Sequence, residues 1–359
     1  MALHTATAVI DLDALSNNYQ LIRALSPNAK VLAVLKANGY GHGLELIAKA
    51  LPNADAFGVA RIDEALALRA AGIVQPIVLL EGFFAEEDIA TLAANNLQTI
   101  VHNEQQLGAV INADLDTPLK VWLKIDTGMH RLGINPEQLS QFHQALSASK
   151  NVQQPIVLMS HLGCADEKGS LVTTKQIALF EELTADFVLE KSLANSAGVL
   201  LWPESHYQWI RPGLLLYGVS PLPIDNCISG IAPVMTLQSS LISIRKISAG
   251  EKVGYGGAWV SENNTTIGVV AIGYGDGYPR HAPNGTPVLI NGRRVPLIGR
   301  VSMDMISVDL GDNSKDNVGD IATLWGKGLA VEEVAEFATT IPYELLCNIT
   351  RRVHIQLAE

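Results

Sequence analysis

Cysteine and long apolar runs are both scarce in this sequence, and each absence excludes a class of protein. The 359 residues include three cysteines, Cys164, Cys227 and Cys347. Their odd number and wide spacing provide neither a disulfide framework nor a zinc motif, which favours a reducing, cytoplasmic setting. Gly, Pro or charged residues break every apolar stretch well before ~20 residues, so none is long enough to span a bilayer. The start, MALHTATAVIDLDAL, has no basic segment and no long apolar core, so we expect no signal peptide.

Positive charge is the second shortage. The chain has 25 Lys and Arg against 36 Asp and Glu, a net charge of −11, and no basic run longer than two residues. We therefore expect no nucleic-acid or membrane partner, and a small anionic ligand would need a local positive pocket. We also expect no metal site, because Asp276 and Asp304 are a conceivable pair of ligands that no spacing rule supports.

Familiar nucleotide and hydrolase motifs are missing as well. There is no G-x-S-x-G, no H-E-x-x-H and no Walker loop. Three glycine-rich segments, GYGHG at 39–43, GYGGAW at 254–259 and GYGDG at 273–277, lack the spacing of a dinucleotide fingerprint. We interpret their glycines as allowing tyrosine-bearing loops to approach a ligand closely.

What the sequence does contain is a regular alternation of two kinds of segment. From Val31 to Arg211, eight strand-length runs rich in Val, Ile and Leu alternate with Ala/Leu/Glu stretches that have helical spacing. This alternation predicts a TIM-type (β/α)8 barrel with buried parallel strands. After Pro233 the runs are β-rich and joined by Gly and Asn turns, with one clear helix, AVEEVAEFATT. We expect an α/β protein with a barrel over residues 1–232 and a C-terminal, mostly β domain over 233–359.

A polar residue lies at or just beyond the end of each of the eight apolar runs. These residues are Lys36, Arg61, Glu81, His102, Lys124, His161, Ser196 and Arg211. Strands often end in polar residues, so a single case carries no information. A complete set indicates a site, because barrel active sites form at the carboxyl rim of the strands.

The segment AVLKANGYGHG, residues 33–43, places Lys36 at the tip of a buried strand. A partly desolvated lysine loses affinity for its proton and becomes a nucleophile able to form a Schiff base. A lysine that snorkels at a strand end, or that pairs with a carboxylate, would give the same pattern.

Two later segments, ANSAG and IRPGLLLYG, follow the seventh and eighth runs, where such barrels commonly bind phosphate. The hydroxyl of Ser196, the backbone N–H groups of Gly213 and Leu214, and Tyr40 from the first loop suit a phosphate dianion. Ser196 and Gly213 could equally be ordinary turn residues.

Taken together, these segments resemble the alanine racemases, pyridoxal phosphate enzymes with a barrel and a β domain, over roughly residues 5–353. The matching segments, in the order of the family, are AVLKANGYGHG, LKIDTGMHRLG, SHLGCADE, ANSAG, IRPGLLLYG, GEKVGYGG and GRVSMDM. The resemblance implies a cytoplasmic isomerase that interconverts L-alanine and D-alanine on pyridoxal 5'-phosphate. Such an enzyme would supply D-alanine for peptidoglycan or serve the catabolism of L-alanine.

The resemblance also implies a role for each matched residue. The two catalytic bases would be Lys36, which would hold the cofactor as an imine, and Tyr255. Cofactor-binding residues would be Lys36, Tyr40, His161, Ser196, Arg211, Gly213 and Leu214. The substrate would bind Arg131 and the backbone of Met303, and Lys124 matches a lysine that some members carry carbamylated. Two positions depart from the family: Arg351 replaces a tyrosine found in some members, and His130 replaces a small residue.

Inversion of a stereocentre is simplest with one base on each face of Cα. We predict that Lys36 serves one enantiomer and Tyr255 the other, and a tyrosine base requires positive or hydrogen-bonding neighbours because its usual pKa is ~10. Arg211 can only donate, so it would leave the pyridine nitrogen unprotonated and favour prompt return of the proton. The alternative for Arg211 is an ion pair with a carboxylate.

In the resembled family, a partner chain completes the site. We therefore expect a homodimer in which Tyr255 and Met303 act on the Lys36 of the other subunit. Three other functions stay open: a racemase of broader range, for example for serine, a barrel amino-acid decarboxylase, and a non-catalytic pyridoxal phosphate-binding protein.

Overall fold

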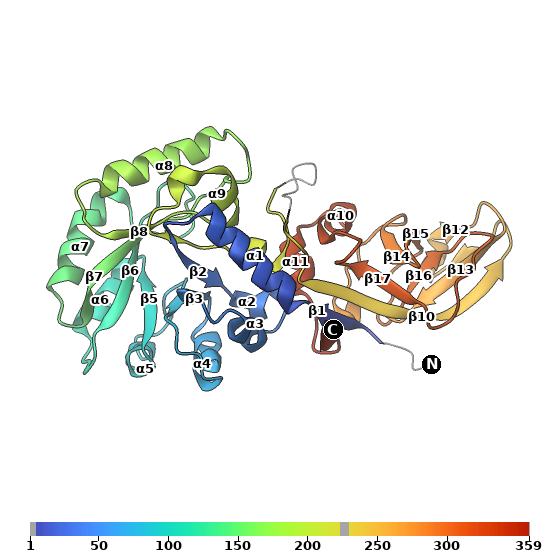
Figure 1. Ribbon diagram of the computed structural model, residues 1–359, viewed down its shortest axis with the longest axis horizontal. Coiled ribbons are helices and arrows are strands. Elements are labelled where there is room, and N and C mark those ends of the chain that lie inside the picture. Colours follow the sequence, from blue (N-terminus) through green and yellow to red (C-terminus); the bar gives the residue numbers. More distant parts are fainter. Residues whose placement is uncertain (1–4, 223–229, 359) are drawn as a thin grey trace.

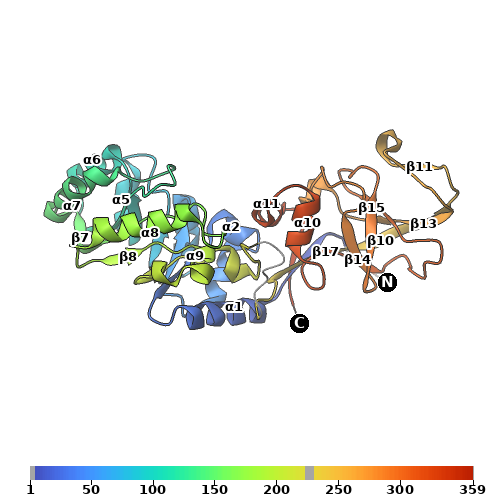
Figure 2. The same ribbon diagram turned by 90° about the horizontal axis from the view of Figure 1, so that it is seen from above.

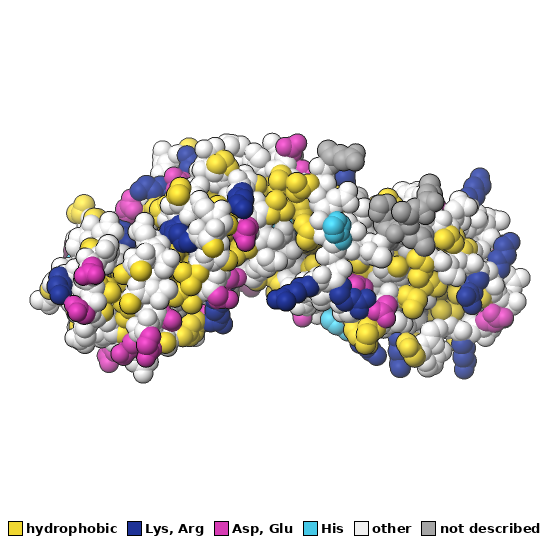
Figure 3. Space-filling view, turned by 90° about the horizontal axis from the view of Figure 1, so that it is seen from below, with side chains coloured by type: hydrophobic (Ala, Val, Ile, Leu, Met, Phe, Trp, Pro, Cys, Tyr) yellow, Lys and Arg dark blue, Asp and Glu magenta, His cyan; other side chains and the backbone are white. Residues whose placement is uncertain are grey.

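The computed structural model describes residues 5–222 and 230–358, so Cys227 lies outside the described residues. A closed barrel and a strand-rich second domain stand end to end (Figure 1). The molecular surface is indented between the two, and acidic and basic side chains are interspersed over the barrel (Figure 3).

The predicted eight-stranded barrel is confirmed. Its strands are all parallel, and the last pairs with the first to close the ring. In order they are β2 (Lys30–Val34), β3 (Ala56–Val59), β4 (Ile77–Leu79), β5 (Leu97–Val101), β6 (Leu119–Lys124), β7 (Val152–Met159), β8 (Glu190–Ser192) and β9 (Trp209–Ile210). Most of their residues are buried, as expected for strands covered on both faces.

Helices cover the outside of the barrel (Figure 1). They are α1 (Leu12–Leu25), α3 (Leu44–Ala50), α4 (Ile62–Ala70), α5 (Asp88–Ala94), α6 (Glu104–Asn112), α7 (Leu139–Ala148), α8 (Leu171–Thr184) and α9 (Ser196–Leu201). Polar side chains fix several starting points: Asp11 accepts from the amide of Ala14, and Asn103 accepts from that of Gln106. Among the described helices, none is both long enough and apolar enough to cross a membrane.

The second domain is a mostly antiparallel sheet in the order β13-β16-β15-β14-β17-β10-β1-β18, in which β10 also pairs with β13. Its strands are β1 (Thr7–Ile10), β10 (Met235–Ile247), β13 (Thr265–Val270), β14 (Pro287–Ile290), β15 (Arg293–Ile298), β16 (Ile306–Asp309), β17 (Ile321–Trp325) and β18 (His354–Leu357). The expected helix is α10 (Val331–Phe337), and a second one that we did not expect, α11 (Pro342–Cys347), follows it.

The N-terminal strand belongs to this second sheet rather than to the barrel. β1 pairs antiparallel with β10 and parallel with β18. The predicted barrel domain, residues 1–232, therefore includes a strand whose hydrogen bonds lie in the other domain. The sequence did not indicate this, because β1 pairs with β10, a strand more than 200 residues further along the chain. Residue 233 stays our proposed boundary for the rest of the chain.

Candidate active site at the barrel rim

A cavity of about 630 Å³ opens at the carboxyl ends of the barrel strands. Six of the eight predicted strand-end residues line it: Lys36, Glu81, Lys124, His161, Ser196 and Arg211. Four further predicted site residues, Tyr40, Arg131, Gly213 and Leu214, line it as well. Arg61 and His102 do not line it. Both contact Glu81 instead. Arg61 pairs with the Glu81 carboxylate at 3.1 Å, and His102 Nε2 lies 3.2 Å from the Glu81 backbone carbonyl.

A left-handed turn follows Lys36 directly. Residues 37–40 all have positive φ, between 51° and 62°, although three of the four are not glycine. This conformation costs roughly 1–2 kcal/mol for each such residue. The amide of Ala37 donates to Glu64 Oε1 at 2.7 Å, so a carboxylate from α4 holds the start of the turn. Strain of this kind, compensated by the surrounding structure, is typical of functional sites.

The predicted phosphate-binding residues come together on one side of the cavity. Ser196 Oγ accepts hydrogen bonds from the amides of Gly213, at 2.9 Å, and Leu215, at 3.3 Å. A Cβ atom at Gly213 would lie 2.4 Å from the Tyr40 hydroxyl, so only glycine allows this approach. Burial raises the pKa of Tyr40 far above its usual value, so its hydroxyl remains a neutral donor. Neutral donors beside a helix start suit a phosphate group.

Four basic side chains and a single carboxylate line the cavity, although the whole chain is acidic. Burial, together with the charges of Arg211, Arg131 and Lys36, lowers the pKa of Lys124 to about 7. Burial and Arg131 also lower the pKa of Lys36. Within the described part of the chain, the Lys36 amine forms no hydrogen bond and no ion pair. The cavity is therefore the local positive pocket that a small anion would need.

Arg211 is buried among neutral acceptors. Its guanidinium donates to Ser192 Oγ and to the carbonyl of Ser160, both at 2.6 Å. No carboxylate of the described residues lies within ion-pair distance of it, so the alternative of an ion pair is wrong for these residues. Burial lowers the pKa of Arg211 to about 10, which leaves the group protonated at neutral pH.

His161 faces Arg211 and is neutral. Its Nδ1 lies 3.2 Å from Arg211 Nη2. Because a guanidinium has only donors, Nδ1 must be the acceptor and the ring proton must be on Nε2. Burial and the charge of Arg211 hold the pKa of His161 well below its usual value.

His130 has a structural role that the sequence did not reveal. The carboxylate of Asp126 accepts from the amides of Gly128, at 2.9 Å, and His130, at 3.1 Å, and contacts His130 Nδ1 at 3.1 Å. Burial raises the pKa of Asp126, but these hydrogen bonds outweigh it and hold the pKa below its usual range. The turn ends at Arg131, which lines the cavity.

Tyr343 is a cavity residue that the sequence analysis missed. It belongs to α11 of the second domain, and its ring lies 6.0 Å from that of Tyr40. Burial raises the pKa of Tyr343 to about 12. The signal was present in the segment IPYELL, because Pro342 at the first helical position is a recognised helix start. A C-terminal tyrosine thus reaches the cavity, while Arg351 is exposed and does not line it.

Two predicted site residues do not reach this cavity. Tyr255 is 70% exposed and lies between β11 (Lys252–Val253) and β12 (Trp259–Val260). Met303 is 52% exposed, in the loop between β15 and β16. The β11 segment lies at the end of the second domain away from the barrel (Figure 2). The roles of Tyr255 and Met303 stay predictions.

The pair Asp276 and Asp304 has an explanation that needs no metal ion. The Arg352 guanidinium joins the two carboxylates, with Nε 3.1 Å from Asp276 and Nη2 2.7 Å from Asp304. Over residues 5–222 and 230–358, no group of three potential metal-ligating side chains occurs.

The barrel, the second domain and a rim cavity lined by four basic side chains are the architecture of a two-domain barrel enzyme. Residues 10–221 match the family model of the alanine racemase N-terminal domain, and residues 234–357 match that of the C-terminal domain. The chain belongs to the alanine racemase family.

Relatives and solved structures agree with this assignment over the whole chain. The sequence is 56% identical to an alanine racemase of Vibrio vulnificus over 359 residues, 99% of this chain and 100% of the relative. It is 57% identical to one of Photobacterium profundum over 354 residues, 98% of this chain and 99% of the relative.

Among solved structures, the biosynthetic alanine racemase of Pseudomonas aeruginosa superposes with a TM-score of 0.95 at 43% identity, covering 99% of this chain and 100% of that one. An alanine racemase of Bartonella henselae, solved with covalently bound pyridoxal phosphate, gives a TM-score of 0.90 at 29% identity, with 99% of both chains covered.

Proposed function

We propose that this chain interconverts L-alanine and D-alanine with pyridoxal 5'-phosphate held in the rim cavity. The observation that carries the proposal is the unpartnered Lys36 amine, set among basic side chains at the carboxyl rim of the barrel. Membership of a family whose members act on alanine with this cofactor gives the substrate and the chemistry.

The residues present fit the cofactor. The close approach of Tyr40 to Gly213 leaves no room for a side chain, which is the kind of cradle that a phosphate group requires. The cavity holds two amines, Lys36 and Lys124, and neither has a hydrogen-bonding partner among the described residues; Lys36 is the one directly followed by the left-handed turn that carries Tyr40. When bound, pyridoxal phosphate supplies an aldehyde that bonds to an amine and a conjugated ring that withdraws electrons from Cα.

Lys36 has two tasks in this proposal. Its amine would hold the cofactor and, once the substrate is bound, would be free to exchange a proton with Cα. Because burial and Arg131 lower the pKa of Lys36, more of the amine is neutral near neutral pH and able to accept a proton. Lys36 would therefore remove or return the Cα proton on one face.

The other face needs a second proton carrier, and we assign it to Tyr255 of a partner subunit in a homodimer. Tyr255 and Met303 lie in neighbouring loops: a Cβ at Gly254 would lie 3.4 Å from the amide nitrogen of Arg300, three residues before Met303. A Cβ at Gly256 would lie 3.5 Å from Arg300 Nη1, which places a cation beside the Tyr255 loop. A tyrosine requires such a neighbour to act as a base.

The remaining residues bind and orient. Arg131 and the N–H of Met303 would bind the carboxylate of alanine, and a guanidinium is well suited to this because its donors form a planar fork. Arg211 would donate to the ring nitrogen of the cofactor, and the neutral His161 would pack against the ring. The Arg211 guanidinium keeps its protons at neutral pH and would leave the ring nitrogen unprotonated, so it would favour racemisation over reactions that need a strongly electron-withdrawing ring.

The first experiment tests Lys36. Purified protein is incubated with L-alanine in deuterated water, and borohydride reduction with peptide mapping locates the attached cofactor. We expect D-alanine that carries deuterium at Cα, cofactor on the Lys36 peptide, and a loss of at least ~10³-fold in Lys36→Ala, since a base and a covalent attachment are both removed. The matched control is Lys49→Ala, an exposed lysine on α3. Equal racemisation by Lys36→Ala would refute the proposal.

The second experiment tests the shared site. Lys36→Ala and Tyr255→Phe proteins are mixed under conditions of subunit exchange. If each site combines residues of two subunits, mixed dimers contain one intact site, and about a quarter of the wild-type activity should return after random exchange. Exchange is verified with differently tagged subunits. Full exchange without recovery would place both bases in the same chain.

Alternatives within the same fold are separable by product. Turnover with a panel of L-amino acids distinguishes an alanine racemase from one that also accepts serine. Release of carbon dioxide would indicate a decarboxylase, and a lack of deuterium at Cα would indicate a cofactor-binding protein without this activity.

A further inference from the structure

The Met303 turn is anchored by the glycine-rich segment 273–277. The amide of Gly275 donates to the Met303 carbonyl at 2.8 Å, and the amide of Tyr274 donates to the Ser302 carbonyl at 3.1 Å. Cβ atoms at Gly273 and Gly275 would lie 2.4 Å and 3.0 Å from the Met303 oxygen. The first two glycines of GYGDG therefore allow the close approach of the Met303 backbone rather than that of a nucleotide.

The turn leaves one donor unused. Across the described residues, the N–H of Met303 has no hydrogen-bond acceptor, while its carbonyl accepts from the amide of Gly275. An exposed backbone N–H held in this way can receive a ligand carboxylate, provided that the turn keeps its orientation.

A second anchor comes from the C-terminal segment. Arg352 reaches Asp304, the residue after Met303, at 2.7 Å, and also Asp276 at 3.1 Å. The other oxygen of the buried Asp276 accepts from the amide of Gly273 at 2.9 Å. Thr350 Oγ1 donates to the Gly275 carbonyl at 2.8 Å. The guanidinium thus ties the turn to the same segment that holds its backbone.

Of the two ion pairs, the one to Asp304 adds little to stability, while the other reaches the 6% exposed carboxylate of Asp276. The side chains of Arg352 and Asp304 are 50% and 52% exposed, and exposed ion pairs contribute little to the free energy of folding. The planar guanidinium of Arg352 contacts Asp276 and Asp304 at the same time. These two contacts fix the orientation of the Met303 turn relative to segment 273–277.

We propose that Arg352 is a positioning residue for substrate binding. Through Asp304 and Asp276 it holds the Met303 turn so that the free N–H faces the carboxylate of the amino-acid substrate. The inference rests on the proposed function, because it requires that the Met303 N–H binds this carboxylate.

The test separates carboxylate binding from the rest of the reaction. Propionate is alanine without its amino group, and ethylamine is alanine without its carboxylate. In Arg352→Gln, we expect KM for alanine and the inhibition constant of propionate to rise together by about tenfold, with kcat changed less than about threefold. The reaction of ethylamine with the cofactor-loaded enzyme should not change. Arg352→Lys keeps the positive charge but loses the planar guanidinium, so its KM and its propionate inhibition constant should lie between those of the wild type and of Arg352→Gln.

The matched control is Arg294→Gln, an arginine of similar exposure (53% against 50%) that pairs with Glu333 at 3.1 Å in the same domain. It should leave both constants unchanged. Asp304→Asn repeats the test from the other partner, in case Arg352→Gln does not fold. An unchanged propionate constant, or an equal loss for ethylamine, would overturn the inference. A wild-type enzyme that does not racemise alanine would instead overturn the proposed function.

Discussion

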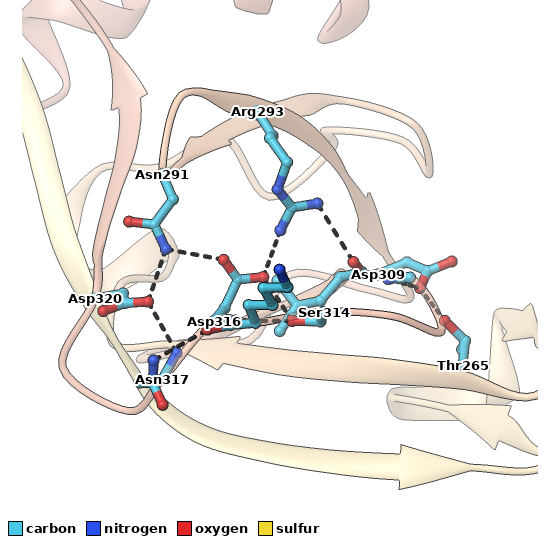
Figure 4. A network of polar contacts seen from close by, with 11 residues as sticks. Thr265, Asn291, Arg293, Asp309, Ser314, Asp316, Asn317 and Asp320 are labelled. Atoms are coloured by element: carbon cyan, nitrogen blue, oxygen red, sulfur yellow. Dashed lines mark hydrogen bonds and ion pairs between the residues drawn. The ribbon is translucent and has the colours of Figure 1, made fainter.

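The rim cavity and a polar network around Asp316 in the second domain handle charge in opposite ways. In the network, Asp316 accepts from Asn291 at 2.9 Å and from Ser314 at 2.7 Å, and it also pairs with Arg293 (Figure 4). In the cavity, the Lys36 amine has no partner among the described residues, and four basic side chains face one carboxylate. Charges that neighbours satisfy hold a loop in place, whereas charges left unsatisfied indicate where a ligand binds.

The pKa values express the same difference. Burial raises the pKa of Asp316, but hydrogen bonds from Ser314, Asn291 and Arg293 outweigh it, so the pKa falls below its usual range. Burial lowers the pKa of Lys36 and of Lys124, and the neighbouring cations lower both further. The network therefore stabilises the charged form of its residue, and the cavity stabilises the neutral form.

The sharpest way to break this comparison is to replace Arg211, a buried cation of the cavity, with a carboxylate. Arg211→Glu would place an acceptor opposite the ring nitrogen of the cofactor and keep that nitrogen protonated. We expect the ratio of transamination to racemisation to rise by about tenfold or more, because a more electron-withdrawing ring delays the return of the proton to Cα. Pyruvate and D-alanine formed from L-alanine give the ratio. Arg211→Lys, which introduces no carboxylate, is the control, and an unchanged ratio in Arg211→Glu would contradict the assignment.

Stability against pH gives a second test. Without cofactor, Lys124 has a folded pKa of about 7 against a usual value of 10.5, so the unfolded chain binds more protons between these values. The free energy of unfolding should therefore rise with pH from about 7 to about 10.5, by up to roughly 1.4 kcal/mol per unit. Lys124→Met should remove about 2–4 kcal/mol of that rise. Urea unfolding of cofactor-free protein at several pH values, at one protein concentration, measures it. If the free energy of unfolding depends on pH in the same way for variant and wild type, burial does not lower the pKa of Lys124.

The smallest expected effect is in the network. Asp316→Asn should lower the free energy of unfolding by about 1–2 kcal/mol at pH 7 and leave racemisation unchanged. Because the folded pKa of Asp316 is depressed, its contribution is complete above the unfolded value of 3.8 and fades as the pH falls below it. Thermal unfolding at pH 7 and at pH 3 checks both points, with the exposed Asp312→Asn as control. A loss of activity in Asp316→Asn would show that this network also serves the site.

Much of the barrel was predictable because its signals are local. Each strand is a short apolar run and each helix has its own periodicity, so the order of elements can be read along the chain. The rim residues followed from the same pattern, since parallel strands bring their carboxyl ends to one edge. Six of eight strand ends line the cavity, and the other two, Arg61 and His102, support Glu81.

Features that depend on distant contacts were not predictable. The left-handed turn at 37–40 is held by Glu64, which lies 27 residues from Ala37. Tyr343 enters the cavity from a helix of the second domain, and no pattern within α11 indicates which barrel loop it meets. Likewise, Arg352 explains the Asp276 and Asp304 pair only after the fold brings three separate segments together.

Because β1 lies between β10 and β18, dividing the chain at one point between the barrel and the second domain would separate β1 from the sheet with which it pairs. A fragment that starts at residue 233 would lack the strand in the middle of that ladder and expose two bare edges, which promotes pairing between copies. A fragment that ends at residue 232 would carry the same strand with nothing to pair with. The four residues of β1, Thr7–Ile10, thus link the N-terminal part of the chain to the sheet of the second domain, and loss of their pairing would remove the neighbour of both β10 and β18.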